Sequence, residues 1–268
     1  MSVDNPQFGR FPVSSGLALP SQEVRLEALN NLESLRRQPY PGRGIVMGLS
    51  NEGKIIQIEY VMGRRETTQN RILRITPDQD VITETFDKSM ENPEAATTMY
   101  RPMTSVDGVH VVSNGDQTDR IAAAFINDVS FEDAMRNESF EPDPSHTPRI
   151  SAYSVPSPDG FRGELGIVTA WDAHSLHPRR SVFEYPPEKG IGRALQTYTG
   201  NGSTDSYQGG AYRLPLTGDF FKIAQEYWQV LNPDYRVAIA VKSIDPSSGN
   251  FAVGVINRHH GGNLVETV

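Results

Sequence analysis

The sequence predicts an α+β protein built from antiparallel hairpins, and three observations support this fold class. Short apolar runs alternate with turn signals such as N-E-G at residues 51–53, a pattern typical of β-hairpins. Helical periodicity is confined to a few segments. Strands and helices do not alternate regularly along the chain, so the pattern does not favour a parallel sheet of β-α-β units.

The chain begins with an irregular segment and one helix. Residues 1–20 contain three prolines, two glycines and three serines, and they predict an irregular arm. Residues 21–37 are expected to form a helix with Ser21 as its N-cap. Its leucines recur at intervals of three, and we expect them on one buried face: Leu26, Leu29, Leu32 and Leu35.

Hairpin strands and a few helices follow this segment. Strands are predicted at residues 44–49, 55–62, 71–75, 81–86, 108–113, 149–155, 163–171, 181–185, 236–243 and 250–257. Helices are predicted at residues 118–129 and 131–138, with a break near Ser130, and at residues 220–231, with Phe221 facing inward. We expect one domain over residues 40–268, preceded by the arm and helix of residues 1–39.

Composition excludes several function classes. With 37% hydrophobic residues, a chain of 268 residues can bury a sizeable core. The net charge of −8 argues against a general nucleic-acid-binding surface. The absence of cysteine excludes disulfides and thiolate chemistry. No apolar run is long enough for a membrane helix and the start lacks a secretory pattern, so we expect no membrane partner and a cytoplasmic location.

Scans for common catalytic motifs find little. The sequence has no phosphate-binding G-x-x-x-x-G-K-[ST], no G-x-S-x-G and no H-E-x-x-H. The G-I-G-R-A segment at residues 190–194 lacks the third glycine of a dinucleotide-binding loop.

Four segments carry arginines, carboxylates and glycines outside the core pattern. They are residues 40–48 (Y-P-G-R-G-I-V-M-G), 63–71 (G-R-R-E-T-T-Q-N-R), 113–119 (S-N-G-D-Q-T-D) and 140–150 (F-E-P-D-P-S-H-T-P-R-I). The third runs from a strand end into a helix that Thr118 or Asp119 is expected to cap. Because free N–H groups at a helix start bind anions, these segments predict an anion site.

The order and spacing of these motifs resemble the archaeal-type IMP cyclohydrolases. That family has a Y-x-G-R strand, a loop ending in N-R, a Y-N segment, an S-N-G-x-x-T-D turn and an N-T-P-R-I strand. The resemblance extends from about residue 40 to residue 171 and is loose beyond it. It implies a four-layer αββα sandwich of antiparallel sheets, similar to the N-terminal-nucleophile hydrolases. It also implies a homo-oligomer that uses neither metal nor cofactor.

The resemblance further implies an activity. The family closes the purine ring of 5-formamidoimidazole-4-carboxamide ribotide to give inosine monophosphate and water. By motif position, the catalytic residues would be Arg71, Tyr100 and Glu141. An arginine or a tyrosine hydroxyl can donate to the oxyanion of the formyl group, and a carboxylate can move the carboxamide proton. The substrate-binding candidates are Arg43, Arg65, Asn70, Asn114, Gly115, Thr118, Asp119 and Arg149.

Departures from the family pattern leave alternatives open. Arg101 follows Tyr100 where the family has asparagine, and His146 replaces the asparagine before T-P-R. These changes allow an altered substrate or a non-catalytic ribotide-binding paralogue. An amide hydrolase of the wider fold would need a nucleophile at a processed N-terminus, and Ser14 and Ser15 lie far upstream of the first strand. Whether Glu141 or Asp143 faces the substrate also stays open.

Overall fold

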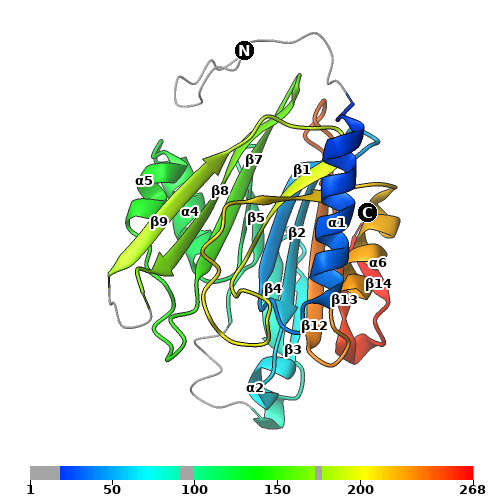
Figure 1. Ribbon diagram of the computed structural model, residues 1–268. Helices are drawn as coiled ribbons and strands as arrows, with labels where there is room; N and C mark the ends of the chain where they lie inside the picture. The colour runs from blue at the N-terminus through cyan, green and yellow to red at the C-terminus, as the bar shows by residue number, and fades with distance from the viewer. Residues whose placement is uncertain (1–18, 91–98, 173–176, 268) are drawn as a thin grey trace.

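Two antiparallel sheets pack face to face, with helices on their outer faces (Figure 1). The computed structural model describes residues 19–90, 99–172 and 177–267. Most of the arm expected over residues 1–20, including Ser14 and Ser15, lies outside the described residues. The arrangement confirms the α+β fold class and its antiparallel sheets. The likeness to N-terminal-nucleophile hydrolases stays a prediction.

The first sheet has the strand order β11-β10-β1-β2-β12-β13-β14. Its strands are β1 (Gly44–Leu49), β2 (Ile55–Met62), β10 (Ile191–Gln196), β11 (Tyr212–Pro215), β12 (Arg236–Ile244), β13 (Phe251–Asn257) and β14 (Leu264–Thr267). The β1–β2 and β12–β13 hairpins are as predicted. The sequence does not predict β10, β11 or β14, because Gly192 interrupts β10 and the other two have only four residues each.

The second sheet follows the chain order from β3 to β9. Its strands are β3 (Arg71–Ile75), β4 (Val81–Thr85), β5 (Met103–Val106), β6 (Val109–Ser113), β7 (Arg149–Ser157), β8 (Gly160–Ala170) and β9 (Pro178–Glu184). Every neighbouring pair is antiparallel, which agrees with the predicted hairpins. Of these strands, only the short β5 is missing from the sequence prediction.

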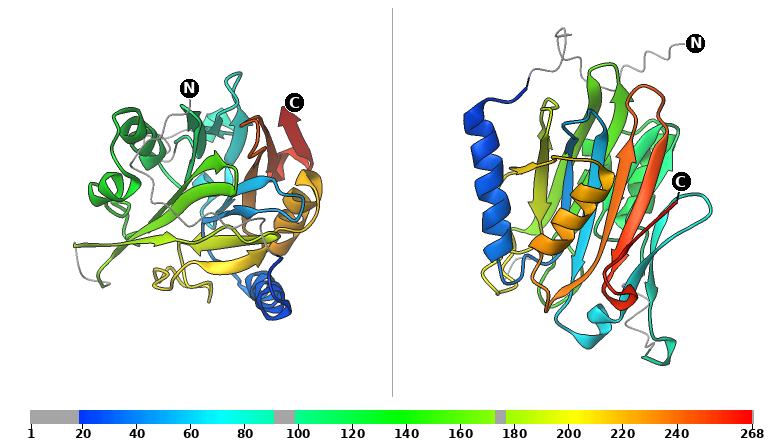
Figure 2. Two further views of the ribbon diagram at one scale, coloured as in Figure 1. Left: turned by 90° about the horizontal axis from the view of Figure 1, so that it is seen from above. Right: turned by 90° about the vertical axis from the view of Figure 1, so that its right-hand side faces the viewer.

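Helices cover the outer face of each sheet (Figure 2). α1 (Gln22–Arg37) and α6 (Phe220–Val230) pack on the first sheet, and α4 (Gln117–Ile126) and α5 (Phe131–Arg136) pack on the second. Ser21 caps α1 as expected, and Ser130, at the predicted break, caps α5, because both hydroxyls accept from backbone N–H groups of the first turn. Among the described residues, three single-turn elements lie at strand ends: α2 (Glu66–Gln69), η1 (Lys88–Met90) and η2 (Arg258–His260).

Alternation along β2 assigns its side chains to two cores. Ile56, Ile58 and Tyr60 pack under α1 and α6. Ile55 and Val61 face the second sheet, in the core between the two sheets. Because successive side chains of a strand point to opposite faces, Gln57 and Glu59 also face this inter-sheet space. A carboxyl group is thereby placed inside the molecule.

Two expectations about helix faces are wrong. Leu26 and Leu29 are half exposed, whereas Leu32 and Leu35 are buried as expected, together with Ala28. The reason is geometric, since each step of three residues falls about 60° short of a full turn and leucines at that interval spiral around the helix. On α6, Phe221 is also half exposed, and the neighbouring Phe220 packs in its place.

No helix in the described part of the chain is both long and apolar enough to cross a membrane.

Candidate active site

A group of largely buried charged and phenolic side chains lies between the two sheets. We call Arg43, Glu59, Arg71, Tyr100 and Glu141 the polar cluster. Arg43 precedes β1, Glu59 lies on β2, Arg71 opens β3, Tyr100 precedes β5 and Glu141 precedes β7. The three residues expected to be catalytic therefore come together from three separate parts of the chain, and Arg43 joins them.

Arg43 and Glu141 form a bidentate ion pair within the polar cluster. Arg43 Nη1 lies 2.7 Å from Glu141 Oε1, and Arg43 Nη2 donates to Glu141 Oε2 at 2.7 Å. Arg43 Nη1 also donates to the carbonyl oxygen of Asn114 at 2.7 Å. Burial opposes the charge on Arg43, but the Glu141 carboxylate outweighs it and holds the pKa of Arg43 well above its usual value. The pair fixes the direction of the Glu141 carboxylate.

Two glycines let the backbone carry Arg43 into this position. Gly42 has a φ of +79°, and a side chain there would collide with Thr197 and Tyr198. A side chain at Gly44 would collide with the ring of Tyr60. The Arg43 N–H donates to Thr197 Oγ1 at 3.0 Å between these glycines. Close packing thus explains the two glycines of the G-R-G part of the first motif.

Tyr100 is held through its backbone and points its hydroxyl at Glu59. The Tyr100 N–H donates to Thr83 Oγ1 at 2.7 Å, and the Thr83 N–H donates to the Tyr100 carbonyl oxygen at 2.9 Å. The Tyr100 hydroxyl oxygen lies 3.1 Å from Glu59 Oε1, within hydrogen-bond distance. Burial raises the pKa of Tyr100, and the carboxylate charge of Glu59 raises it further. Tyr100 is therefore a neutral hydrogen-bond donor at physiological pH.

Glu59 is the buried acid of the polar cluster. Its side chain is fully inaccessible to solvent, and its second oxygen, Oε2, has no hydrogen-bond partner among the described residues. Burial raises the pKa of Glu59 to about 8, against the opposing effects of Tyr100, Arg43 and Arg71. Glu59 is thus mostly protonated at neutral pH.

Arg71 completes the polar cluster from the first position of β3. It is 7% exposed, and its Nε has no hydrogen-bond partner among the described residues. Burial lowers the pKa of Arg71, and the nearby charge of Arg43 acts in the same direction, whereas Tyr100 and Glu141 oppose it. An N–H donor left without a partner in such a buried place is suited to receive a ligand oxygen.

Asn70, which precedes Arg71, has a structural task. Its side-chain amide donates to the Asp87 carbonyl oxygen at 3.0 Å, and its amide oxygen accepts from the Asp87 N–H at 2.8 Å. Both polar ends of the side chain thus bind the backbone that follows β4. In the N-R dipeptide of the motif, Asn70 therefore fixes the neighbouring backbone and Arg71 provides the charged side chain.

The loop between α5 and β7 directs Glu141, rather than Asp143, toward the polar cluster. The Asp143 carboxylate accepts from the Thr147 N–H at 2.7 Å and from the Thr147 hydroxyl at 2.6 Å. The Thr147 hydroxyl also lies 2.7 Å from the Tyr198 hydroxyl. Asp143 closes this loop, which leaves Glu141 to pair with Arg43.

A second cationic region adjoins the polar cluster at Tyr40. The guanidinium carbon of Arg64 lies 4.3 Å from the centre of the Tyr40 ring. Burial raises the pKa of Tyr40, and the charges of Arg43, Arg64 and Arg71 oppose this rise. The positive charges of three arginines therefore all favour the ionised form of the Tyr40 phenol. Arg65, the candidate from the sequence, is exposed at the start of α2, as its neighbour Arg64 is.

The remaining substrate-binding candidates lie at the start of α4. The Asn114 amide oxygen accepts from the Ile150 N–H at 2.9 Å, and its amide nitrogen donates to the Pro148 carbonyl oxygen at 2.9 Å. Asn114 thus joins β6 to β7, next to Gly115. Arg149 binds the Asp116 carboxylate and the Gln117 amide oxygen, the latter at 2.6 Å.

The expected capping of α4 is wrong. The helix begins at Gln117 after Asp116, so Thr118 and Asp119 lie inside its first turn. Thr118 is buried, and its hydroxyl donates to the Gly115 carbonyl oxygen at 3.0 Å. Asp119 pairs with Arg101 at 3.3 Å. Asp116 and Asp119 thus place two carboxylates, each paired with an arginine, near the helix start that the sequence predicts as an anion site.

Two of the departures from the family pattern, Arg101 and His146, have separate environments. Arg101 donates to Asp80 at 2.8 Å besides pairing with Asp119. His146 has a φ of +45°, and its ring centre lies 4.7 Å from that of Phe140. Neither side chain has a contact with the polar cluster in the described part of the chain.

Two residues of the site escaped sequence reasoning. Glu59 belongs to the run I-I-Q-I-E-Y-V-M, where it stands out with Gln57 as a polar side chain on alternate positions. Arg64 lies beside Arg65 in the same motif, and only the structure distinguishes the two. The signal for Glu59 was present in the period-two pattern of a strand that is buried on both faces.

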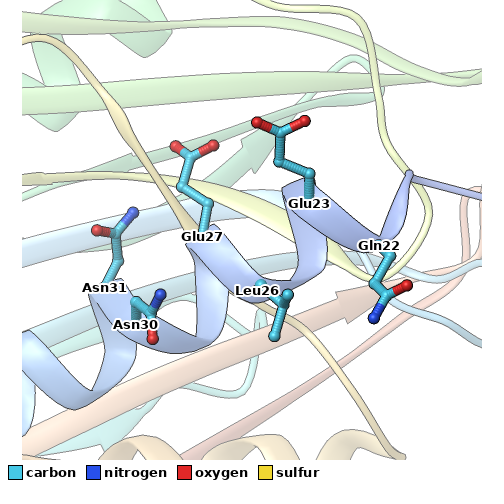
Figure 3. Close-up of a pocket in the computed structure, with 6 residues that line it drawn as sticks. All are labelled: Gln22, Glu23, Leu26, Glu27, Asn30 and Asn31. Atoms are coloured by element: carbon cyan, nitrogen blue, oxygen red, sulfur yellow. The ribbon is translucent and has the colours of Figure 1, made fainter.

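An open depression lies elsewhere, along the outer face of α1 (Figure 3). It is lined by Gln22, Glu23, Leu26, Glu27, Asn30 and Asn31. Side chains of one helix provide this lining, whereas the polar cluster faces the opposite side of the first sheet. The depression is therefore separate from the candidate active site.

Comparison with known families agrees with the motif resemblance. The sequence model for "IMP cyclohydrolase-like protein" matches residues 40–249. A search among curated proteins finds no significant match. The family match spans most of the chain and includes every residue of the polar cluster. The chain therefore belongs to the IMP cyclohydrolase-like protein family.

Proposed function

We propose that the protein closes the purine ring of 5-formamidoimidazole-4-carboxamide ribotide, giving inosine monophosphate and water. The observation that carries this proposal is the convergence of Arg71, Tyr100 and Glu141 in one buried cluster. Family membership supports the same reaction class. The reaction joins two groups of one molecule, so the protein's tasks are to orient them, stabilise charge and move protons.

In the first step, the carboxamide nitrogen attacks the formyl carbon. A C–N bond forms, and the electron pair of the carbonyl bond moves to the formyl oxygen. Arg71 and Tyr100 donate hydrogen bonds to this developing oxyanion. Donors positioned in a buried site are worth more than donors in water, because no solvent competes for them and no reorganisation is needed.

Glu141 moves the protons of the reaction. Its carboxylate takes the proton from the attacking nitrogen and delivers it to the oxyanion. It then passes the proton of the formamido nitrogen to the hydroxyl group, which leaves as water while the C=N bond forms. Arg43 supports both transfers, since its bidentate contact holds the carboxylate in one direction.

We further propose that Arg64 binds the 5′-phosphate of the ribotide. Arg64 is exposed and lies next to the polar cluster, whose own arginines, Arg43 and Arg71, are largely buried. A phosphate near Tyr40 would be within the field of all three charges. This assignment replaces Arg65 and the start of α4 as the favoured phosphate site.

The experiment that tests the reaction is direct. Purified protein is mixed with the ribotide, with and without a chelator, and inosine monophosphate is followed by chromatography. Product formed at the same rate in both samples supports acid–base ring closure by these side chains. Tight binding of inosine monophosphate without turnover would favour the non-catalytic paralogue instead. The absence of both turnover and binding would refute the ribotide site.

A further inference from the structure

Glu59 is a buried acid that the reaction above does not use. It lies on the inter-sheet face of β2, where Ile45 is its neighbour on β1 and Ala240 its neighbour on β12. Its contact within the polar cluster is the Tyr100 hydroxyl, at 3.1 Å from Oε1. Because no atom of Glu59 reaches solvent, the residue stands behind Tyr100 and acts on a ligand only through it.

Which of Glu59 and Tyr100 donates the hydrogen bond between them depends on whether the Glu59 carboxyl group is protonated. A phenol has a single O–H to donate. An ionised Glu59 accepts that proton strongly, since a charged acceptor forms the shorter and stronger bond. Tyr100 would then have no proton to offer to a ligand.

The protonated carboxyl group reverses this situation. Oε2 has no hydrogen-bond partner among the described residues, so a proton placed there would remain without an acceptor. A proton placed on Oε1 finds an acceptor in the Tyr100 oxygen. Since buried polar groups satisfy their hydrogen bonds wherever they can, the second arrangement is favoured. It turns the Tyr100 O–H away from Glu59 and makes it available.

We infer that Glu59 is a positioning residue for ring closure: its carboxyl group donates to the Tyr100 oxygen and directs the Tyr100 hydroxyl at the formyl oxygen of the ribotide. This inference rests on the proposed function. No proton leaves its heavy atom in this arrangement, so Glu59 orients a donor and takes no part in the proton transfers of Glu141.

The electrostatic surroundings are consistent with this role. Burial raises the pKa of Glu59 to about 8, so the donating form prevails at neutral pH and is lost above about pH 8. The groups facing Glu59 are Tyr100, Arg43 and Arg71, and Tyr60 is its neighbour on β2. The phenols remain neutral well above this range, because burial raises the pKa of both. Glu59 is therefore the member of this set that changes protonation near pH 8.

The test is the pH profile of turnover for the wild type, Glu59→Gln and Glu59→Leu. We expect the wild-type kcat to fall above about pH 8, as Glu59 ionises. Glu59→Gln keeps an N–H donor behind Tyr100 at every pH, so its kcat at pH 7 should lie within about threefold of wild type and its decline near pH 8 should disappear. Glu59→Leu keeps the bulk without a donor, and its kcat should fall about tenfold at an unchanged KM.

A matched control separates this effect from general ionisation. Burial, with the nearby charge of Glu184, raises the pKa of Glu164 on β8 to about 7. Glu164→Gln therefore removes a carboxyl of similar titration outside the polar cluster, and it should leave the pH profile unchanged.

Two results would overturn the inference. One is a Glu59→Gln profile that keeps the wild-type decline near pH 8. The other is a Glu59→Gln loss by one constant factor at every pH, which would indicate a purely structural residue. With either result, a wild type that closes the ring would leave the proposed function intact. A wild type that does not close the ring would refute the proposed function itself.

Discussion

The Arg43 guanidinium holds the Glu141 carboxylate through two contacts of 2.7 Å, and this pair joins the segment before β1 to the loop before β7. Both residues belong to sequence motifs that lie about one hundred positions apart. The contact brings the two motifs together in one charged site. An oriented carboxylate beside buried hydrogen-bond donors can move protons.

Replacement of Glu141 tests the proton-transfer role. Glu141→Gln keeps the shape of the side chain and removes the base, so turnover should fall by at least about tenfold while ribotide binding stays nearly intact. Asp143→Asn is the matched control, since Asp143 binds Thr147 and closes the loop. A large loss of turnover for Asp143→Asn, with none for Glu141→Gln, would reverse the assignment. Steady-state kinetics of both variants provide the measurement.

Arg71 is expected to act on the transition state rather than on binding. Arg71→Lys removes the planar set of donors and places a more readily neutralised amine in a buried position. We expect kcat to fall by about 10²-fold with KM within about threefold. Arg74→Lys, on the same strand and half exposed beside Glu84, should change neither constant. A rise in KM alone for Arg71→Lys would make Arg71 a binding residue.

The adjacent arginines Arg64 and Arg65 allow a paired test of phosphate binding. Each replacement by alanine removes one positive charge, so their net-charge effects are identical. Arg64→Ala should raise KM for the ribotide about tenfold and weaken its dependence on salt concentration. Arg65→Ala should have the smaller effect on both. The opposite ranking, measured at several ionic strengths, would return the phosphate site to Arg65.

Lys242 makes stability depend on pH. It is buried between the sheets and donates to Ser105 Oγ at 2.8 Å. Burial lowers its pKa from 10.5 to about 7, against the opposing charge of Asp80. Between these values the unfolded chain binds a proton that the folded chain does not bind, so folding stability falls as pH drops from about 10 to about 7.

Lys242→Met should remove this dependence. The wild type should gain on the order of a few kcal/mol of unfolding free energy relative to the variant between pH 7 and pH 10. Urea denaturation of both proteins at the two pH values measures the difference. A constant difference between the two proteins at both pH values would show that Lys242 keeps its ordinary pKa.

Much of the fold could be predicted because hairpin signals are local. The turn at residues 51–53 and the apolar runs on either side of it specify the β1–β2 pair without knowledge of the rest of the chain. The candidate catalytic residues were accessible for a related reason. Arg71, Tyr100 and Glu141 follow from the family resemblance, whose motifs are short local segments at strand starts or in loops.

The rest of the site depends on tertiary packing. Glu59 lies inside a strand whose two faces are both buried, so its role emerges only when the second sheet covers it. The sequence predicts an anion site at the start of α4, whereas in the structure Asp116 lies there, paired with Arg149. The expectation for the α1 leucines is wrong for a simpler reason, since side chains three residues apart do not point in one direction on a helix.

The central claim is that the polar cluster closes the purine ring, and the most direct test is the initial rate of inosine monophosphate formation by the wild type and by Tyr100→Phe. The wild type should form product well above the uncatalysed rate. Tyr100→Phe, which lacks the hydroxyl that faces Glu59, should be slower by about 10²-fold. A folded wild type that forms no product above the uncatalysed rate, or a Tyr100→Phe variant that matches it, would contradict the claim.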